Sequence, residues 1–228
     1  MKIIAIDTTT QYVALGIADG GKEYGCDINL GVKHSMLLVP VIERAMVAAG
    51  LSLKDITYFA CGIGPGSFTG VRVGLSTVKG LCWALNKPII GIPSLDTIAR
   101  NVPQQYGDAV IVPVLDAKRG LVYASMYKRK GKIYTKRSGY LLVSAGELMK
   151  KVPADAVFTG DAVGLYRDIF MQGAKKAVLL DKDYWYPASH ALLSCVKEKL
   201  QTGTIDDIFK LNPLYLYAKE CQINTLKK

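Results

Sequence analysis

Residues 62–80 read GIGPGSFTGVRVGLSTVKG, with six glycines and a proline at the start of a hydrophobic segment. Glycine-rich turns between a strand and a helix often bind phosphate through backbone amides. The spacing here fits neither common pattern. A P-loop has the pattern G-x-x-x-x-G-K-[S/T], in which a lysine follows the second glycine. In this stretch no lysine stands at that position. The dinucleotide pattern G-x-G-x-x-G has Thr69 in place of its third glycine. Binding of an anion by the amides at Ser67 and the two residues after it stays open.

The glycines are instead spaced as one stripe of a helix. Gly66, Gly70 and Gly74 are four residues apart, which places them on one helical face. Each interior glycine costs about 1 kcal/mol relative to alanine, so the stripe favours close approach of another backbone. The other residues of the helix are mostly apolar, which predicts burial on two sides. The second neighbour is either the helix predicted at 34–49 or a partner protein, and the two interpretations are compatible.

We take the partner interpretation as the working hypothesis. It combines the helices predicted at 34–49 and 67–85 into one contact surface. The predicted partner-contact residues are Leu38, Ile42, Gly66, Gly70, Val73, Gly74 and Thr77.

The order of predicted elements is repeated along the chain. An apolar strand at 2–6 ends in Asp7, and two further strands follow. A later strand reaches Asp116 and again leads into two strands, the last of which lies in the basic stretch that ends at residue 137. Helices and strands alternate after each of these meanders, which predicts an α/β protein with two lobes. We place the division at residue 102, giving lobes 1–102 and 103–228. The last residues are candidates for packing back on the first lobe.

The composition favours an acidic partner. The chain has a formal net charge of +10 and a pI near 9.3, and nucleic acid is the obvious counterpart. The one dense basic stretch is KRKGKIYTKR at 128–137, which reads as a hairpin turning at Gly131. A merely solvated hairpin explains it equally well. Apolar runs are too short for a membrane span, and the start turns polar too soon for a secretory signal, so we expect a cytoplasmic protein.

The residue types that hold metals are sparse. His34 and His190 are far apart, and Leu38 stands one helical turn after the first of them. The five cysteines are scattered without a C-x-x-C pair, which argues against zinc and against a disulfide framework. We therefore predict no metal site and no cofactor.

Five stretches together resemble one protein family. They are AIDTTT, the glycine-rich block, GIPSLDTIA, DAKRGLVYAS and LNPLYLY, in that order from near the N-terminus to near the C-terminus. This set is similar to the TsaB family of bacterial tRNA threonylcarbamoyladenosine biosynthesis proteins. The resemblance implies two ribonuclease H-like lobes of the actin, sugar-kinase and Hsp70 superfold.

The resemblance also implies a function. TsaB proteins are non-catalytic partners that bind and activate TsaD, which transfers a threonylcarbamoyl group to the adenosine beside the tRNA anticodon. An ATPase, TsaE, joins the pair. When TsaD is absent, we expect the apolar surface of the two predicted helices to pair with a second copy of the chain, and we expect contact with tRNA to be indirect or weak. Catalytic relatives hold a metal through two histidines one helical turn apart, and this sequence lacks that pair.

Two aspartates stand where nucleotide-using members of the superfold place their phosphate turns. Asp7 begins DTTTQ and Asp116 begins DAKRG, whose Lys-Arg pair is bulky for a phosphate loop. We regard Asp7, Thr8, Ser67 and Asp116 as a vestigial nucleotide or anion site. The alternative for each aspartate is a turn residue bonded to its own backbone. An autonomous ATPase-like enzyme is the second hypothesis for function, and a metallopeptidase is a weaker third.

Overall fold

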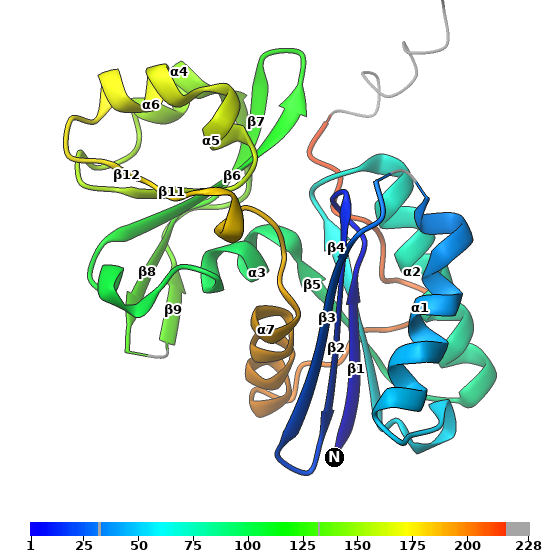
Figure 1. Ribbon diagram of the computed structural model, residues 1–228. Helices are drawn as coiled ribbons and strands as arrows, with labels where there is room; N and C mark the ends of the chain where they lie inside the picture. The colour runs from blue at the N-terminus through cyan, green and yellow to red at the C-terminus, as the bar shows by residue number, and fades with distance from the viewer. Residues whose placement is uncertain (32, 132, 218–228) are drawn as a thin grey trace, which may run out of the picture. The chain divides into compact units, whose positions relative to one another are not determined.

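The computed structural model describes residues 1–31, 33–131 and 133–217, and the chain divides into two compact units (Figure 1). Unit 1 comprises Met1–Asn101 and Tyr186–Pro213, and unit 2 comprises Val102–Trp185 and the segment from Leu214 onward. The first boundary lies one residue from the sequence-based division. Residues 186–213, which that division gave to the second lobe, belong to unit 1.

Unit 1 is a five-stranded sheet with helices on both faces (Figure 1). Its elements are β1 (Lys2–Asp7), β2 (Tyr12–Asp19), β3 (Lys22–Asn29), α1 (His34–Ala48), β4 (Tyr58–Gly64), α2 (Phe68–Leu85), β5 (Ile89–Pro93), α3 (Ser94–Arg100) and α7 (Ser189–Gln201), with a short 3₁₀ turn at Leu53–Asp55. The strand order is β3-β2-β1-β4-β5. The first three strands pair antiparallel, and β1, β4 and β5 pair parallel.

Alternation along β1 explains the two covered faces. Ile4 and Ile6 point into the core beneath α1 and α2, whereas Ile3 and Ala5 point into a second core beneath α7. All four side chains are fully buried. A strand buried on both faces reads as a continuous apolar run, which is how KIIAI appears in the sequence.

Helix α7 reaches unit 1 from far along the chain. The backbone amide and Oγ of Ser189 donate to the Asp27 carboxylate on β3, at 2.9 and 3.1 Å. Gly16 on β2 leaves space for Leu193, because a Cβ there would lie 2.7 Å from the leucine Cγ. These contacts join residues more than 160 positions apart, and local pattern in the sequence does not reveal them.

Unit 2 repeats the topology of unit 1. Its elements are β6 (Val110–Lys118), β7 (Leu121–Ala124), β8 (Tyr127–Lys130), β9 (Ile133–Lys136), β10 (Leu141–Ser144), α4 (Ala145–Met149), β11 (Val157–Thr159), α5 (Ala162–Leu165), α6 (Arg167–Gly173) and β12 (Val178–Leu179), with 3₁₀ turns at Gln104–Tyr106 and Lys182–Tyr184. The order β10-β7-β6-β11-β12 has the same two antiparallel and two parallel pairings. The predicted fold of two ribonuclease H-like α/β lobes is confirmed.

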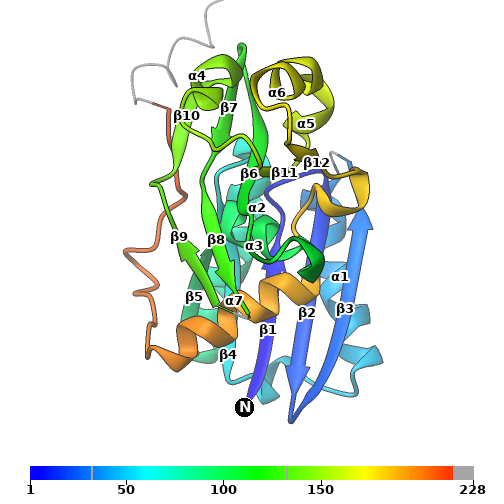
Figure 2. The same cartoon turned by 90° about the vertical axis from the view of Figure 1, so that its left-hand side faces the viewer.

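One strand assignment in unit 2 needs correction. The third strand of the meander is β10, not the basic stretch at 128–137. That stretch forms the predicted hairpin, β8 and β9, with Gly131 in its turn at φ 60° (Figure 2). The hairpin pairs with the sheet only where β8 meets the first two residues of β6, so it is an insertion in the repeated topology.

Candidate functional site

The first candidate residue, Asp7, is the last residue of β1 and is 1% exposed. Its Oδ1 accepts hydrogen bonds from the amide and hydroxyl of Thr9, at 2.8 and 2.5 Å, and its Oδ2 accepts one from the Ser94 hydroxyl at 3.2 Å. Burial raises the pKa of the Asp7 carboxyl, and the bonds from Thr9 and Ser94 oppose that rise. The carboxylate is thus bonded to its own turn and to α3.

Gly70 and Gly74 of α2 pack on this same turn, and so does Gly66, which lies just before the helix and not within it as its spacing had predicted. A Cβ at Gly70 would overlap the carbonyl oxygen of Thr8, one at Gly74 would overlap the Thr8 hydroxyl, and one at Gly66 would overlap the carbonyl of Thr9. The Thr8 hydroxyl donates to the carbonyl of Gly70 at 2.7 Å. The predicted close approach of another backbone is present, but that backbone is the chain's own β1–β2 turn. The assignment of these three glycines to a partner contact is therefore corrected.

Ser67 and Thr8 both form hydrogen bonds at the contact between the β1–β2 turn and the start of α2. The Ser67 hydroxyl caps α2 by accepting from the amide of Gly70 at 3.2 Å, and the Ser67 amide donates to the carbonyl of Thr9 at 2.7 Å. Thr8 is fully buried. The polar side chains of this region bond to their own turn and helix: the Thr8 hydroxyl donates to the carbonyl of Gly70, the Ser67 hydroxyl accepts from the amide of Gly70, and the Asp7 carboxylate accepts from Thr9 and Ser94.

The remaining predicted contact residues are divided between core and partly exposed positions. Leu38 and Ile42 are 1% and 3% exposed and lie in the core beneath α1, so their assignment to a partner surface is wrong. Their four-residue spacing marks the side of α1 that faces its own sheet. Val73 and Thr77 on α2 are half-buried, and Val73 packs on that same core.

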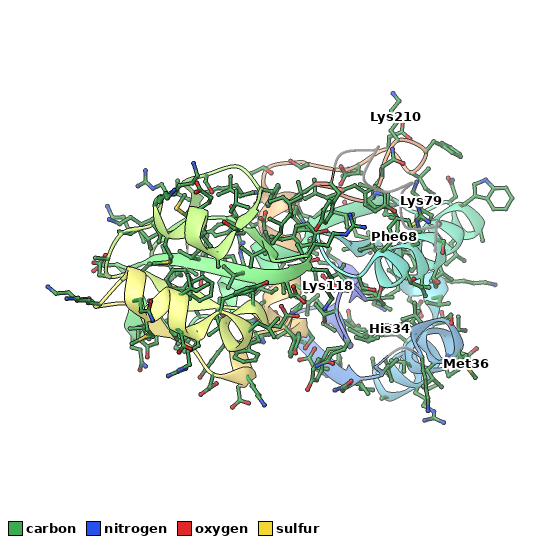
Figure 3. All side chains as sticks on the ribbon, turned by 90° about the horizontal axis from the view of Figure 1, so that it is seen from above. His34, Met36, Phe68, Lys79, Lys118 and Lys210 are labelled. Atoms are coloured by element: carbon green, nitrogen blue, oxygen red, sulfur yellow. The ribbon has the colours of Figure 1, made fainter. Side chains whose placement is uncertain are left out.

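Five exposed apolar side chains on α1 and α2 form what we call the α1–α2 surface. They are Met36, Val39, Val47, Phe68 and Trp83, with exposed fractions from 48% to 79%. The two helices lie side by side on one face of the sheet (Figure 1), and Met36 points away from it (Figure 3). Sequence reasoning missed these residues because it followed the core stripe. The signal was that α1 is also apolar at positions off that stripe.

The second aspartate turn, in unit 2, is built differently. The Asp116 carboxylate accepts from the amide and the ammonium of Lys118, at 2.8 and 2.5 Å, while the amide of Asp116 donates to Asp161 at 2.8 Å. The hydrogen bond to Asp116 raises the pKa of Lys118, and burial raises that of Asp161. The chain's own ammonium group therefore occupies one side of this carboxylate.

The backbone of that turn is left-handed at three successive residues. Lys118, Arg119 and Gly120 have φ of 63°, 55° and 76°. For the two residues with side chains this region is unfavourable, and such strain often accompanies function. Their side chains are exposed at the end of β6, where Figure 3 labels Lys118.

Within residues 1–31, 33–131 and 133–217, no three His, Cys, Asp or Glu side chains gather closely enough to hold a metal ion. Over the same residues, no helix is long and apolar enough to cross a membrane.

Comparison with known families places most of the chain in one group. The family model of TsaD, described as tRNA N6-adenosine threonylcarbamoyltransferase, matches residues 31–220. The TsaB protein of Escherichia coli K12, a tRNA threonylcarbamoyladenosine biosynthesis protein, is 27% identical over 220 residues, covering 95% of this chain and 94% of that protein. The Bacillus subtilis TsaB is 28% identical, covering 74% of this chain and 75% of its own length.

Solved structures agree on the fold. A Pseudomonas aeruginosa protein described as similar to the peptidase YeaZ superposes with a TM-score of 0.86 at 24% identity, covering 95% of this chain and 99% of that one. The structure of YeaZ from the same organism gives a TM-score of 0.83, also at 24% identity, and covers 94% and 100%.

Proposed function

The chain belongs to the TsaB family, within the family that the TsaD model describes, and from this premise we propose that it serves in the formation of threonylcarbamoyladenosine in tRNA. Its role is that of a non-catalytic scaffold that binds TsaD and activates it. TsaE joins this pair, and two copies of the chain pair with each other when TsaD is absent.

The observation that carries the partner role is the α1–α2 surface. Met36, Val39 and Val47 fall on one stripe of α1 at spacings of three and eight residues. Phe68 and Trp83 are exposed apolar side chains near the two ends of α2, about 22 Å apart along the helix. Large apolar side chains that stay exposed on neighbouring elements of a folded protein commonly mark a protein contact. Protein interfaces usually have a polar rim around an apolar centre. We therefore expect this stripe to lie at the centre of the contact.

The two aspartate turns support the non-catalytic part of the proposal. The Asp7 carboxylate accepts three hydrogen bonds inside unit 1 and is almost fully buried. The Asp116 carboxylate is bound by the amide and ammonium of Lys118. A Mg²⁺ ion needs carboxylate oxygens that face an open site. Titration with ATP and Mg²⁺ is expected to give no micromolar binding to the isolated chain.

Reconstitution tests the proposal. Unmodified tRNA and threonylcarbamoyl-adenylate are incubated with this chain, with TsaD, with both, and with both plus TsaE, and the modified nucleoside is quantified after digestion. We expect no product from this chain alone and a clear stimulation when it is added to TsaD. Product formed by the chain alone would refute the scaffold role. Failure to stimulate TsaD would refute the activator role.

A further inference from the structure

The positive charge of the chain is concentrated in one segment of unit 2. Residues 117–146 hold eight lysines and arginines and no aspartate or glutamate. The chain has 29 basic and 19 acidic residues. The remaining 21 basic residues and all 19 acidic residues therefore lie outside this segment. Outside this segment the formal charge is only +2, so +8 of the net +10 lies in this one segment of unit 2.

The β8–β9 hairpin displays part of this charge as an ordered array. Lys128 and Lys130 alternate along β8 with buried residues, and both are exposed. Thr135 pairs with Lys128, and the amide of Arg137 donates to the carbonyl of Met126 at 2.7 Å, which continues the ladder. By the two-residue period, Arg137 falls on the face of Lys128 and Lys130. Neighbouring cations along β8 are roughly 6–7 Å apart.

Within the part of the chain that the structure describes, these three cations have no acidic partner. The ion pairs among the described residues do not involve Lys128, Lys130 or Arg137. Like charges side by side on a strand pair repel one another and lower stability. A polyanion laid along the hairpin relieves that repulsion and releases its own condensed counterions.

A buried arginine fixes the hairpin at its base. Arg129 is 3% exposed, and its guanidinium donates to the carbonyls of Val102 and Pro103, both at 2.7 Å, and to the Tyr134 hydroxyl at 3.1 Å. Lys136 lies over the ring of Tyr140 at 3.7 Å. The exposed cations therefore lie on a hairpin that is held in place by side-chain contacts. A hairpin that is already ordered loses less conformational entropy on binding than a flexible loop does. Figure 2 shows the ribbon leaving the sheet of unit 2.

We propose that the β8–β9 hairpin binds the phosphate backbone of RNA through Lys128, Lys130 and Arg137. The choice of RNA over another polyanion rests on the proposed function, in which the substrate is a tRNA. Contact with phosphates alone gives affinity that does not depend on base sequence and falls steeply with salt. Arg129 positions the hairpin and does not touch the RNA.

The test measures the affinity of the full chain for a fluorescein-labelled, unmodified tRNA transcript by anisotropy, between about 50 and 200 mM salt. The variant K128Q/K130Q/R137Q is compared with K175Q/K176Q/K182Q, which removes the same charge from exposed lysines elsewhere in unit 2. For the hairpin variant we expect affinity at least about tenfold lower and a log–log salt slope shallower by about 2–3. The control should stay within about twofold of wild type.

Equal losses in the two variants would overturn the proposal, because they would reflect net charge alone. So would a wild-type chain that binds vesicles of anionic phospholipid but not tRNA. Capture of TsaD by the hairpin variant is measured in parallel. If TsaD binds normally while tRNA affinity is unchanged, the hairpin proposal fails and the scaffold role stands. If the wild-type chain fails to bind TsaD, the scaffold role fails, and the tRNA measurement on the isolated chain still decides the hairpin.

Discussion

Asp7 in unit 1 and Asp116 in unit 2 occupy the same place in the same strand order, and their carboxylates are held in different ways. In unit 1 the turn lies beneath the glycines of α2 and is sealed from solvent. In unit 2 the turn is strained, exposed and closed by the ammonium of Lys118. One duplicated turn has thus become part of a core, while its copy has become a surface feature. Substitutions in the two turns should therefore have unequal effects.

The largest effect is expected for Gly70→Ala. The added methyl group would overlap the backbone carbonyl of Thr8, which cannot move without disturbing the β1–β2 turn. We expect a loss of about 3 kcal/mol in unfolding free energy, measured by chemical denaturation. Gly80→Ala on the same helix is the control, since nothing lies near its Cβ position, and it should stabilise by about 0.5–1 kcal/mol. Equal stability of the two variants would show that the stripe does not pack on its own turn.

The next largest loss of stability is expected when the carboxylates of Asp7 and Asp116 are removed one at a time. Asp7→Ala removes the acceptor of the buried Thr9 amide and leaves the buried hydroxyls of Thr9 and Ser94 with only their bond to each other. We expect a cost of about 2–3 kcal/mol. Asp116→Ala releases the Lys118 ammonium, which is 82% exposed and turns to water, at a cost of about 1 kcal/mol or less. A larger loss of unfolding free energy for Asp116→Ala than for Asp7→Ala would show that the turn in unit 2, and not the turn in unit 1, is the one that stabilises its unit.

A smaller effect of opposite sign is expected in the strained turn. Arg119 is exposed and has φ 55°, a region that glycine occupies without penalty. Arg119→Gly should therefore raise stability by about 0.5 kcal/mol, after the added flexibility of the unfolded chain is taken into account. Thermal melting at neutral pH measures it. A destabilised variant would show that the Arg119 side chain makes a contact of its own.

The smallest effect is a pH dependence of unit 1. Burial raises the pKa of Asp7 above its unfolded value of about 4, so the folded chain retains this proton to higher pH than the unfolded chain does. The contribution of Asp7 to stability is then greatest below that unfolded value and declines as pH rises through the raised one. Asp7→Asn, which does not titrate, should lack this decline. Denaturation of both proteins at several pH values from about 3 upward checks the difference, and parallel profiles would contradict it.

The sequence predicted local features well and long-range neighbours poorly. The 3.6-residue period located α1 and α2, the turn residue Gly131 located the hairpin, and the two aspartates marked the duplicated meander. The four-residue spacing of the glycines correctly predicted a close backbone neighbour. It could not identify that neighbour, because Thr8 is 62 residues from Gly70 and meets it only through the strand order.

The division into units and the exposed surface were beyond local pattern for the same reason. Helix α7 joins unit 1 through Ser189 and Asp27, which are 162 residues apart. Apolar periodicity identifies the buried side of a helix, as it did at Leu38, and is silent about apolar residues that stay exposed, such as Met36 and Trp83. That Met36 and Trp83 are exposed follows only from the three-dimensional arrangement of their neighbours.

The affinity of TsaD for a variant of the α1–α2 surface decides whether this surface is the partner contact. Met36→Glu with Trp83→Glu places two charges on exposed positions of α1 and α2 and leaves the core untouched. Leu165→Glu is the matched control, an exposed apolar residue of unit 2. With circular dichroism and melting unchanged, we expect the double variant to bind TsaD about 30-fold more weakly or worse, and the control to bind as wild type does. A folded double variant that binds TsaD with wild-type affinity would show that the α1–α2 surface is not the contact with TsaD.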